Sequence, residues 1–188
     1  LWASLETSLA VVFRDLKTPW VVITIISAYQ SPSSSATSGP TTFHTQQLLT
    51  LRKNNDSLLH PRKAFVRDLR ILLQEFASQQ HEIILCGDFN QSLGLESSLA
   101  SVLSDFHLTD IHGSHLGLES EVSTYARGSK RLDYMFCTPV LAGNVLRCGA
   151  EPFNAVYYSD HQALYVDFSF EGVFDNNLPI LCRPQSQG

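Results

Sequence analysis

A short apolar run leads directly into the polar motif Gly87-Asp88-Phe89-Asn90. Residues 83–86 are all apolar, which predicts a strand that is buried on both faces, and the glycine permits a turn or a close approach. Asp88 and Asn90 follow where the strand opens, a place where rigid scaffolds often hold reactive side chains. A carboxylate and an amide here are suited to orienting and deprotonating water, although the same residues also form ordinary Asx turns.

Three further polar motifs stand at expected strand boundaries. Ser159-Asp160-His161 precedes a strand, Arg131-Leu132-Asp133-Tyr134 opens another, and Tyr29 closes a third. Each alone has a structural explanation: a capped turn, an ion pair, and a core tyrosine with its hydroxyl at the edge. Together they supply carboxylates, an amide, an imidazole and a phenol. This set suits metal-assisted attack of water on a phosphodiester, in which a carboxylate-held histidine donates to the phosphate oxygens.

Helices and strands must bring these motifs together. Residues 20–29 are β-branched and aromatic, which predicts a strand. Residues 61–78 predict a helix, because apolar side chains recur at spacings of four, three and four from Phe65 to Phe76. A helix that feeds the buried strand at 83–86 indicates an α/β fold. We also expect helices at 43–51 and 95–103, strands at 108–111, 134–137, 145–147 and 163–170, and loops at 31–41, 113–120 and 151–159.

Composition limits the classes of function. The chain has 188 residues, of which 44% are hydrophobic and 16% charged, as expected for one globular domain. No apolar run approaches the roughly 18 residues that span a bilayer, so no membrane partner is expected. With a net charge of −5, phosphate binding would depend on a divalent metal and on local Arg or Lys. The four cysteines lack metal-ligand spacing, which favours a reduced intracellular protein, and His112 and His115 are interpreted as surface histidines.

In this order, the motifs at 87–90, 131–134 and 159–161 resemble the endonuclease/exonuclease/phosphatase superfamily, which includes deoxyribonuclease I-like and apurinic endonuclease-like enzymes. Residues Thr124-Tyr125-Ala126-Arg127-Gly128 make the chain similar, more narrowly, to the endonuclease domain of a non-LTR (LINE-type) retrotransposon, as does the Gly-Pro-Thr-Thr segment at 39–42. The resemblance implies an α/β fold in which two packed mixed sheets are flanked by helices, a four-layer α/β/β/α sandwich.

The resemblance implies roles around the attacking water and the phosphate. Asp88 would position or deprotonate the water, and Asn90 would hold that water or a phosphate oxygen. His161 would contact the scissile phosphate, with its ring oriented by Asp133. Tyr29 would approach the phosphate or the leaving oxygen.

The resemblance also implies metal and DNA contacts. Asp160 would help to bind the metal, with Mg²⁺ expected and Mn²⁺ as a second choice. A DNA-facing loop would supply substrate-binding residues, although its basic residues could equally form only a solvated turn. The residues expected to bind substrate are Thr124, Tyr125, Arg127 and Arg131.

The implied function is Mg²⁺-dependent nicking of DNA to prime reverse transcription. The expected partners are DNA and a reverse transcriptase domain in the parent polyprotein, and the expected location is intracellular, in the nucleus with the retrotransposon complex. One alternative is a phosphatase or phosphodiesterase of the same superfamily that acts on a small molecule or lipid. Another is a catalytically inactive remnant.

The remnant alternative rests on the start of the chain. In the family, an asparagine and the glutamate that is the main metal ligand both end strands before the strand at 20–29. Only nineteen residues precede that strand here, and Glu6 does not end a buried strand. We therefore expect residues 1–170 to form an N-terminally incomplete domain, and 171–188 a tail or linker.

Overall fold

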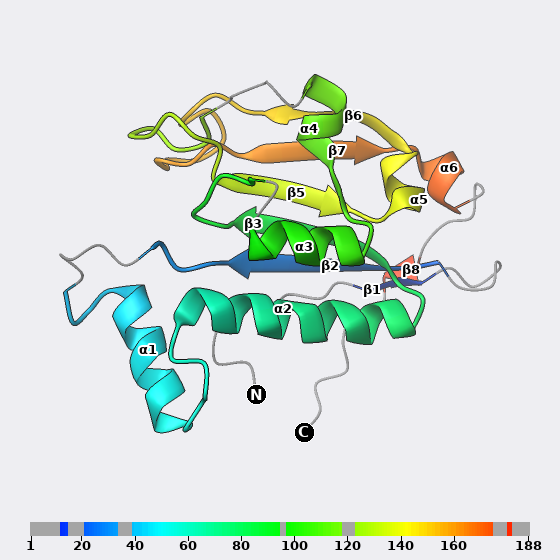
Figure 1. Ribbon diagram of the computed structural model, residues 1–188. Coiled ribbons are helices and arrows are strands. Elements are labelled where there is room, and N and C mark those ends of the chain that lie inside the picture. Colours follow the sequence, from blue (N-terminus) through cyan, green and yellow to red (C-terminus); the bar gives the residue numbers. More distant parts are fainter. Residues whose placement is uncertain are drawn as a thin grey trace.

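A parallel pair of strands, β2 (Val22–Tyr29) and β3 (Glu82–Asp88), lies at the centre of the large sheet. Parallel strands need a long crossover connection, and here it contains the helices α1 (Phe43–Lys53) and α2 (Pro61–Ser78). The register places Tyr29 beside Asp88, so the polar ends of both strands meet at one edge of the sheet. Figure 1 shows both strands running to the same end of the molecule.

The remaining strands complete two sheets and confirm the expected α/β class. The large sheet has the order β4-β5-β3-β2-β1-β8, in which only β2 and β3 pair in parallel. The second sheet is the antiparallel pair β6 and β7, whereas the expectation was a mixed sheet. The strand bounds are Val12–Arg14 (β1), Thr109–Asp110 (β4), Asp133–Cys137 (β5), Val145–Ala150 (β6), Leu164–Phe168 (β7) and Ile180–Leu181 (β8).

These statements come from a computed structural model that describes residues 12–14, 21–33, 39–94, 97–117, 123–174 and 180–181. The expectations for the remaining residues, including Glu6 and part of the loop at 31–41, lie outside the described residues. Within the described part of the chain, no helix is long and apolar enough to cross a membrane.

Alternate side chains of β3 enter two different cores, as the uninterrupted apolar run predicts. Ile83 and Leu85 pack with α2 and with α3 (Ser98–Asp105), whereas Ile84 packs toward β6 and β7. Figure 1 shows the large sheet lying between α2 and the β6–β7 pair. Burying each such side chain contributes about 1.5–3 kcal/mol, so the strand that carries Asp88 is fixed from both sides.

Two segments differ from the sequence expectation. The loop expected at 113–120 is wrong up to residue 116, because α4 (Ile111–Leu116) is helical and lies against β6. His112 is buried there and its Nε2 lies 2.8 Å from the Gly149 carbonyl oxygen, so it is not a surface histidine. Tertiary packing here overrides the weak helix propensity of Gly113.

The expected tail also contains ordered elements. The short helix α5 (Pro139–Ala142) packs near α6 (Phe170–Phe174), whose Val173 belongs to the second core, and β8 pairs with β1. Apolar residues near the end of the chain are therefore used to cover the second core, which corrects the tail prediction for these residues. The division into a domain at 1–170 and a tail stays a prediction for the rest.

Gly87 allows β2 and β3 to approach each other. Its φ is +145°, and a Cβ at this position would lie 1.8 Å from the Ala28 carbonyl oxygen. Because that atom belongs to the backbone of the central strand, we expect Gly87→Ala to lower the free energy of unfolding by about 3 kcal/mol. Urea denaturation measures this loss. Gly94→Ala is the matched control, since nothing lies within 4 Å of the added Cβ, and equal stability of the two variants would contradict the prediction.

Candidate active site

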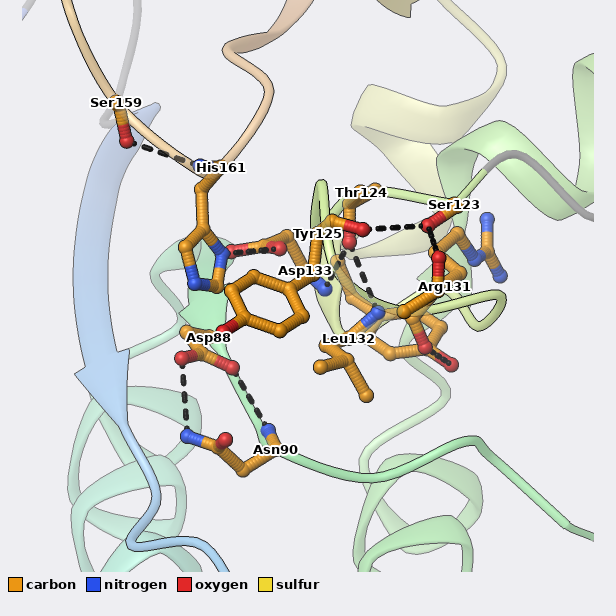
Figure 2. Close-up of polar contacts among 12 residues, drawn as sticks. Asp88, Asn90, Ser123, Thr124, Tyr125, Arg131, Leu132, Asp133, Ser159 and His161 are labelled. Carbon is orange, nitrogen blue, oxygen red and sulfur yellow. Dashed lines mark hydrogen bonds and ion pairs between the residues drawn. The ribbon is translucent and has the colours of Figure 1, made fainter. Parts of the chain in front are cut away.

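Asp88, Asp133 and His161 converge at the polar edge of the large sheet. Asp88 ends β3 and Asp133 begins β5, and the two residues are direct partners in the antiparallel register. His161 comes from the loop that leads into β7, and its Nδ1 lies 2.9 Å from Asp133 Oδ2. Figure 2 shows the three side chains pointing toward one another. Residues far apart in the chain thus form one cluster, as the motifs at strand boundaries predict.

Contacts on several sides hold the imidazole of His161. Its backbone N–H donates to Ser159 Oγ at 3.0 Å, and its backbone forms an isolated bridge with Tyr125. The Tyr125 ring lies 5.1 Å from the imidazole, measured between centroids, and Figure 2 shows the two side chains next to each other. Burial alone would lower the pKa of His161, but the hydrogen bond and charge of Asp133, with the charges of Asp88 and Asp160, raise it overall. The site therefore favours a protonated, oriented histidine.

Asn90 fixes the carboxylate of Asp88. Its backbone N–H donates to Asp88 Oδ1 at 2.8 Å and its side-chain amide donates to Oδ2 at 2.9 Å. The amide also donates to the Gln30 carbonyl oxygen at 2.9 Å, which links the ends of β2 and β3. The Asn90 side-chain amide therefore positions the Asp88 carboxylate and the end of β2, a role that the sequence did not indicate. Burial, and next the charge of Asp133, raise the pKa of Asp88. The hydrogen bonds from Asn90 and the charge of His161 lower it, but the net pKa is raised.

The same cluster offers a set of metal ligands. One ligand atom each from Asp88, Asp133 and His161 lie within 4.8 Å of one another. The carboxylate of Asp160, the expected ligand, is half exposed and lies 3.5 Å from the Arg127 guanidinium. Asp160 thus lies next to the cluster in the chain without being part of this group, and its role in metal binding stays a prediction.

Tyr29 lies at the rim of the cluster, beside Asp88 in the register of the two strands. Its ring packs edge-on against Phe43, with 4.9 Å between centroids, and its side chain is partly exposed. Burial and the charge of Asp88 raise the pKa of its hydroxyl, while a hydrogen bond with Asn90 opposes this. The phenol is therefore held protonated next to the carboxylate, where it is a potential hydrogen-bond donor.

Two of the expected substrate-binding residues have structural roles. Thr124 is fully buried, and its hydroxyl oxygen accepts hydrogen bonds from the N–H groups of Leu132 at 2.9 Å and Asp133 at 3.1 Å. Arg131 pairs with Asp110 and lies over the Tyr134 ring at 4.3 Å. Both residues shape the start of β5, and their contact with DNA stays a prediction. The loop position alone did not reveal that their polar groups point inward.

Arg127 and Tyr125 lie where a substrate could reach them. The Arg127 side chain is 77% exposed, and Tyr125 is half-buried beside His161. The short loop that holds them joins the His161 segment through two backbone hydrogen bonds. These run from Ala126 N–H to the Asp160 carbonyl oxygen at 2.8 Å and from Gln162 N–H to the Thr124 carbonyl oxygen at 2.9 Å.

Sequence reasoning missed Arg62, which bridges the loops after β2 and β3. Its guanidinium donates to the carbonyl oxygens of Ser31 at 3.2 Å and Asn90 at 3.3 Å, and to the Gln91 side chain. A cation in the first turn of a helix opposes the helix dipole. That unfavourable position, directly after Pro61, was the available signal that the Arg62 side chain binds a group outside its own helix.

We expect Arg62→Ala to lower kcat for phosphodiester hydrolysis by up to about 10²-fold with little change in KM, because the Asn90 loop loses its anchor. Steady-state kinetics measures this split. The adjacent Lys63 is exposed on the same helix turn, so Lys63→Ala is the control and should match the unaltered chain. Unchanged kcat in Arg62→Ala would show that the bridge has no part in positioning the site.

The family model of the endonuclease/exonuclease/phosphatase family matches residues 5–161. The chain belongs to this family. A metal-capable cluster at the strand ends is consistent with the family, whose members are metal-dependent phosphodiester hydrolases. The chain is accordingly a hydrolase of the phosphodiesterase type.

Solved structures of similar fold include other enzymes of endonuclease/exonuclease/phosphatase type. An AP endonuclease from Archaeoglobus fulgidus is 16% identical with a TM-score of 0.53, and the match covers 86% of this chain and 72% of that one. The 3′ phosphatase NExo from Neisseria, bound to product DNA hairpin, is 15% identical with a TM-score of 0.56. That match covers 87% of this chain and 72% of the NExo chain.

The endonuclease domain of TRAS1, a telomere-specific non-LTR retrotransposon, is 17% identical with a TM-score of 0.51. That match covers 85% of this chain and 63% of the TRAS1 domain. At these identities the likeness concerns the fold of the family. No curated protein sequence matches the chain.

Proposed function

We propose that this chain hydrolyses phosphodiester bonds in DNA with the help of Mg²⁺, or of Mn²⁺ as a second choice. The observation that carries the proposal is the cluster of Asp88, Asp133 and His161 in a member of this family. Carboxylate oxygens are the ligands that these hard cations prefer, whereas imidazole suits softer transition metals. The donor set therefore fits a hard cation on Asp88 and Asp133, which leaves the imidazole for the phosphate.

A bound divalent cation would polarise the phosphate and lower the pKa of water in the site. The side chains of the chain supply the remaining chemistry. Asp88, held by Asn90, orients and deprotonates the attacking water, and its raised pKa suits a general base working nearer neutral pH. Protonated His161, oriented through Nδ1 by Asp133, donates from Nε2 to a non-bridging oxygen where charge accumulates. At the rim of the cluster, the Tyr29 hydroxyl donates a hydrogen bond to the phosphate or to the leaving oxygen.

DNA is the substrate that best fits the neighbouring surface. The exposed Arg127 and Lys130 can contact backbone phosphates beside the cluster. The NExo structure of similar fold is described as bound to product DNA hairpin. The order of the motifs and the fold shared with the TRAS1 domain support the narrower proposal of a retrotransposon endonuclease. That proposal includes a reverse transcriptase partner and a nuclear location.

Plasmid nicking tests the proposal. The chain should convert supercoiled plasmid to the nicked form with Mg²⁺ and should stop when EDTA removes the metal. Release of phosphate from a 3′-phosphorylated duplex without nicking would favour a phosphatase. Absence of both activities would favour the inactive remnant. Nicking that persists in EDTA would contradict the metal dependence.

A further inference from the structure

Three consecutive exposed apolar side chains lie on the loop at residues 152–158, which precedes His161 in the chain and which we name the tyrosine loop. Val156 and Tyr157 are 66% and 54% exposed, and Tyr158 is 97% exposed. Large apolar side chains grouped on the surface usually mark an interaction site. None of these three side chains takes part in the chemistry described above.

Two hydrogen bonds connect the ends of the tyrosine loop. The Glu151 N–H donates to the Ala163 carbonyl oxygen at 2.8 Å and closes the base of the loop. Asn154 takes a left-handed backbone conformation with a φ of 62°, and its Oδ1 accepts from the Ser159 N–H at 3.1 Å. Because one hydrogen bond closes the base of the loop and the other spans residues 154–159, the tyrosines lose little further backbone freedom on binding a partner.

The tyrosine loop and the reacting group belong to one connected segment. Tyr158 precedes His161 by three residues, and the intervening Ser159 accepts the His161 N–H at 3.0 Å. The neighbouring loop, which presents Arg127 and Lys130, is joined to the same segment through Asp160. In Figure 1, the loops before β5 and before β7 lie together at the end of the molecule where β2 and β3 end.

We propose that Tyr158, supported by Tyr157, stacks on an unpaired nucleobase that flanks the phosphate at the cluster, an inference that rests on the proposed function. Aromatic side chains bind single-stranded bases by stacking, whatever the base, because every base has a π-face. The loop joined to this segment carries the exposed cations Arg127 and Lys130, and the Arg127–Asp160 pair is exposed enough to be weak, so the guanidinium can contact a phosphate. Aromatic rings and cations on two connected loops are the two kinds of group that would bind a base and its phosphate. The preferred substrate is thus DNA with an unpaired base at the cleavage position.

Binding measurements without metal test this inference separately from catalysis. Fluorescence anisotropy gives the Kd of the full chain for a duplex with one bulged base and for the fully paired duplex. We expect a preference for the bulged duplex, and we expect Tyr158→Ala to weaken that Kd about tenfold, which corresponds to 1.4 kcal/mol. Tyr158→Phe and Tyr158→Trp should keep the preference, because they keep a ring. Leu146→Ala, at another exposed apolar side chain, is the matched control.

Each outcome decides the inference. Equal Kd values for Tyr158→Ala and the unaltered chain would overturn it, as would loss of binding in Tyr158→Phe. Sedimentation with phosphatidylcholine–phosphatidylserine vesicles that depends on Tyr158 would assign the loop to a lipid surface and also overturn it. Plasmid nicking with an unaltered bulge preference in Tyr158→Ala would defeat only the inference. Ring-dependent bulge binding without any phosphodiester hydrolysis would defeat only the proposed function.

Discussion

His161→Gln is expected to lower kcat/KM for DNA nicking by about 10³-fold. Glutamine keeps a hydrogen-bonding side chain but cannot carry the proton that the charges of Asp133, Asp88 and Asp160 stabilise on the imidazole. Initial nicking rates with saturating Mg²⁺ measure the loss. His115→Gln is the matched control, because His115 is exposed on α4, away from the cluster. Equal nicking by His161→Gln would remove His161 from the reaction.

The same residue predicts a pH dependence with a defined sign. If the protonated imidazole is the active form, nicking falls as the pH rises through the raised pKa of His161. Asp133→Asn removes the negative charge that helps to raise this pKa and leaves only a neutral, weaker acceptor for Nδ1, while the burial that lowers the pKa remains. The alkaline limb of the pH profile should therefore move to lower pH in Asp133→Asn. An alkaline limb at the same pH in both proteins would show that this histidine does not control it.

The cluster was predictable from sequence because its residues follow a rule of sheet topology. Asp88 and Asp133 stand at boundaries of apolar strands, and neighbouring strands bring such boundaries to one edge. The helix α2 and the double burial of β3 follow from apolar periodicity in the same way.

Other features depend on contacts between residues far apart in the chain, which periodicity does not encode. Arg62 donates hydrogen bonds to carbonyl oxygens 28 and 31 residues away. The Thr124 hydroxyl oxygen accepts hydrogen bonds from the N–H groups at the start of β5. The helix α4 forms where β6 supports it, against the local signal of Gly113. The sequence pattern thus located the residues of the cluster, while the groups that position them became visible only in the fold.

Asp88→Asn is expected to abolish nicking, by about 10³-fold or more, without unfolding the chain. In the metal-free protein, burial and the charge of Asp133 raise the pKa of Asp88 above its ordinary value of 3.8. The folded state then holds this proton more tightly than the unfolded chain, so the contribution of Asp88 to stability is greatest below that ordinary value and is lost as the pH rises through the raised pKa. A neutral amide avoids that loss, and without metal at neutral pH the variant should unfold at least as high in temperature as the unaltered chain.

Metal binding separates the two roles of this carboxylate. Mg²⁺ should raise the unfolding temperature of the unaltered chain, because a ligand that binds only the folded state stabilises it, and the rise should shrink in Asp88→Asn. Asp105→Asn is the matched control, since Asp105 is the last residue of α3 and an exposed partner of Arg70, and it should keep both nicking and the response to Mg²⁺. Full nicking by Asp88→Asn would contradict its role as base. A lost activity with an unchanged Mg²⁺ response would keep Asp88 as the base but remove it from the metal ligands, because only ligation links this carboxylate to the metal-dependent stability.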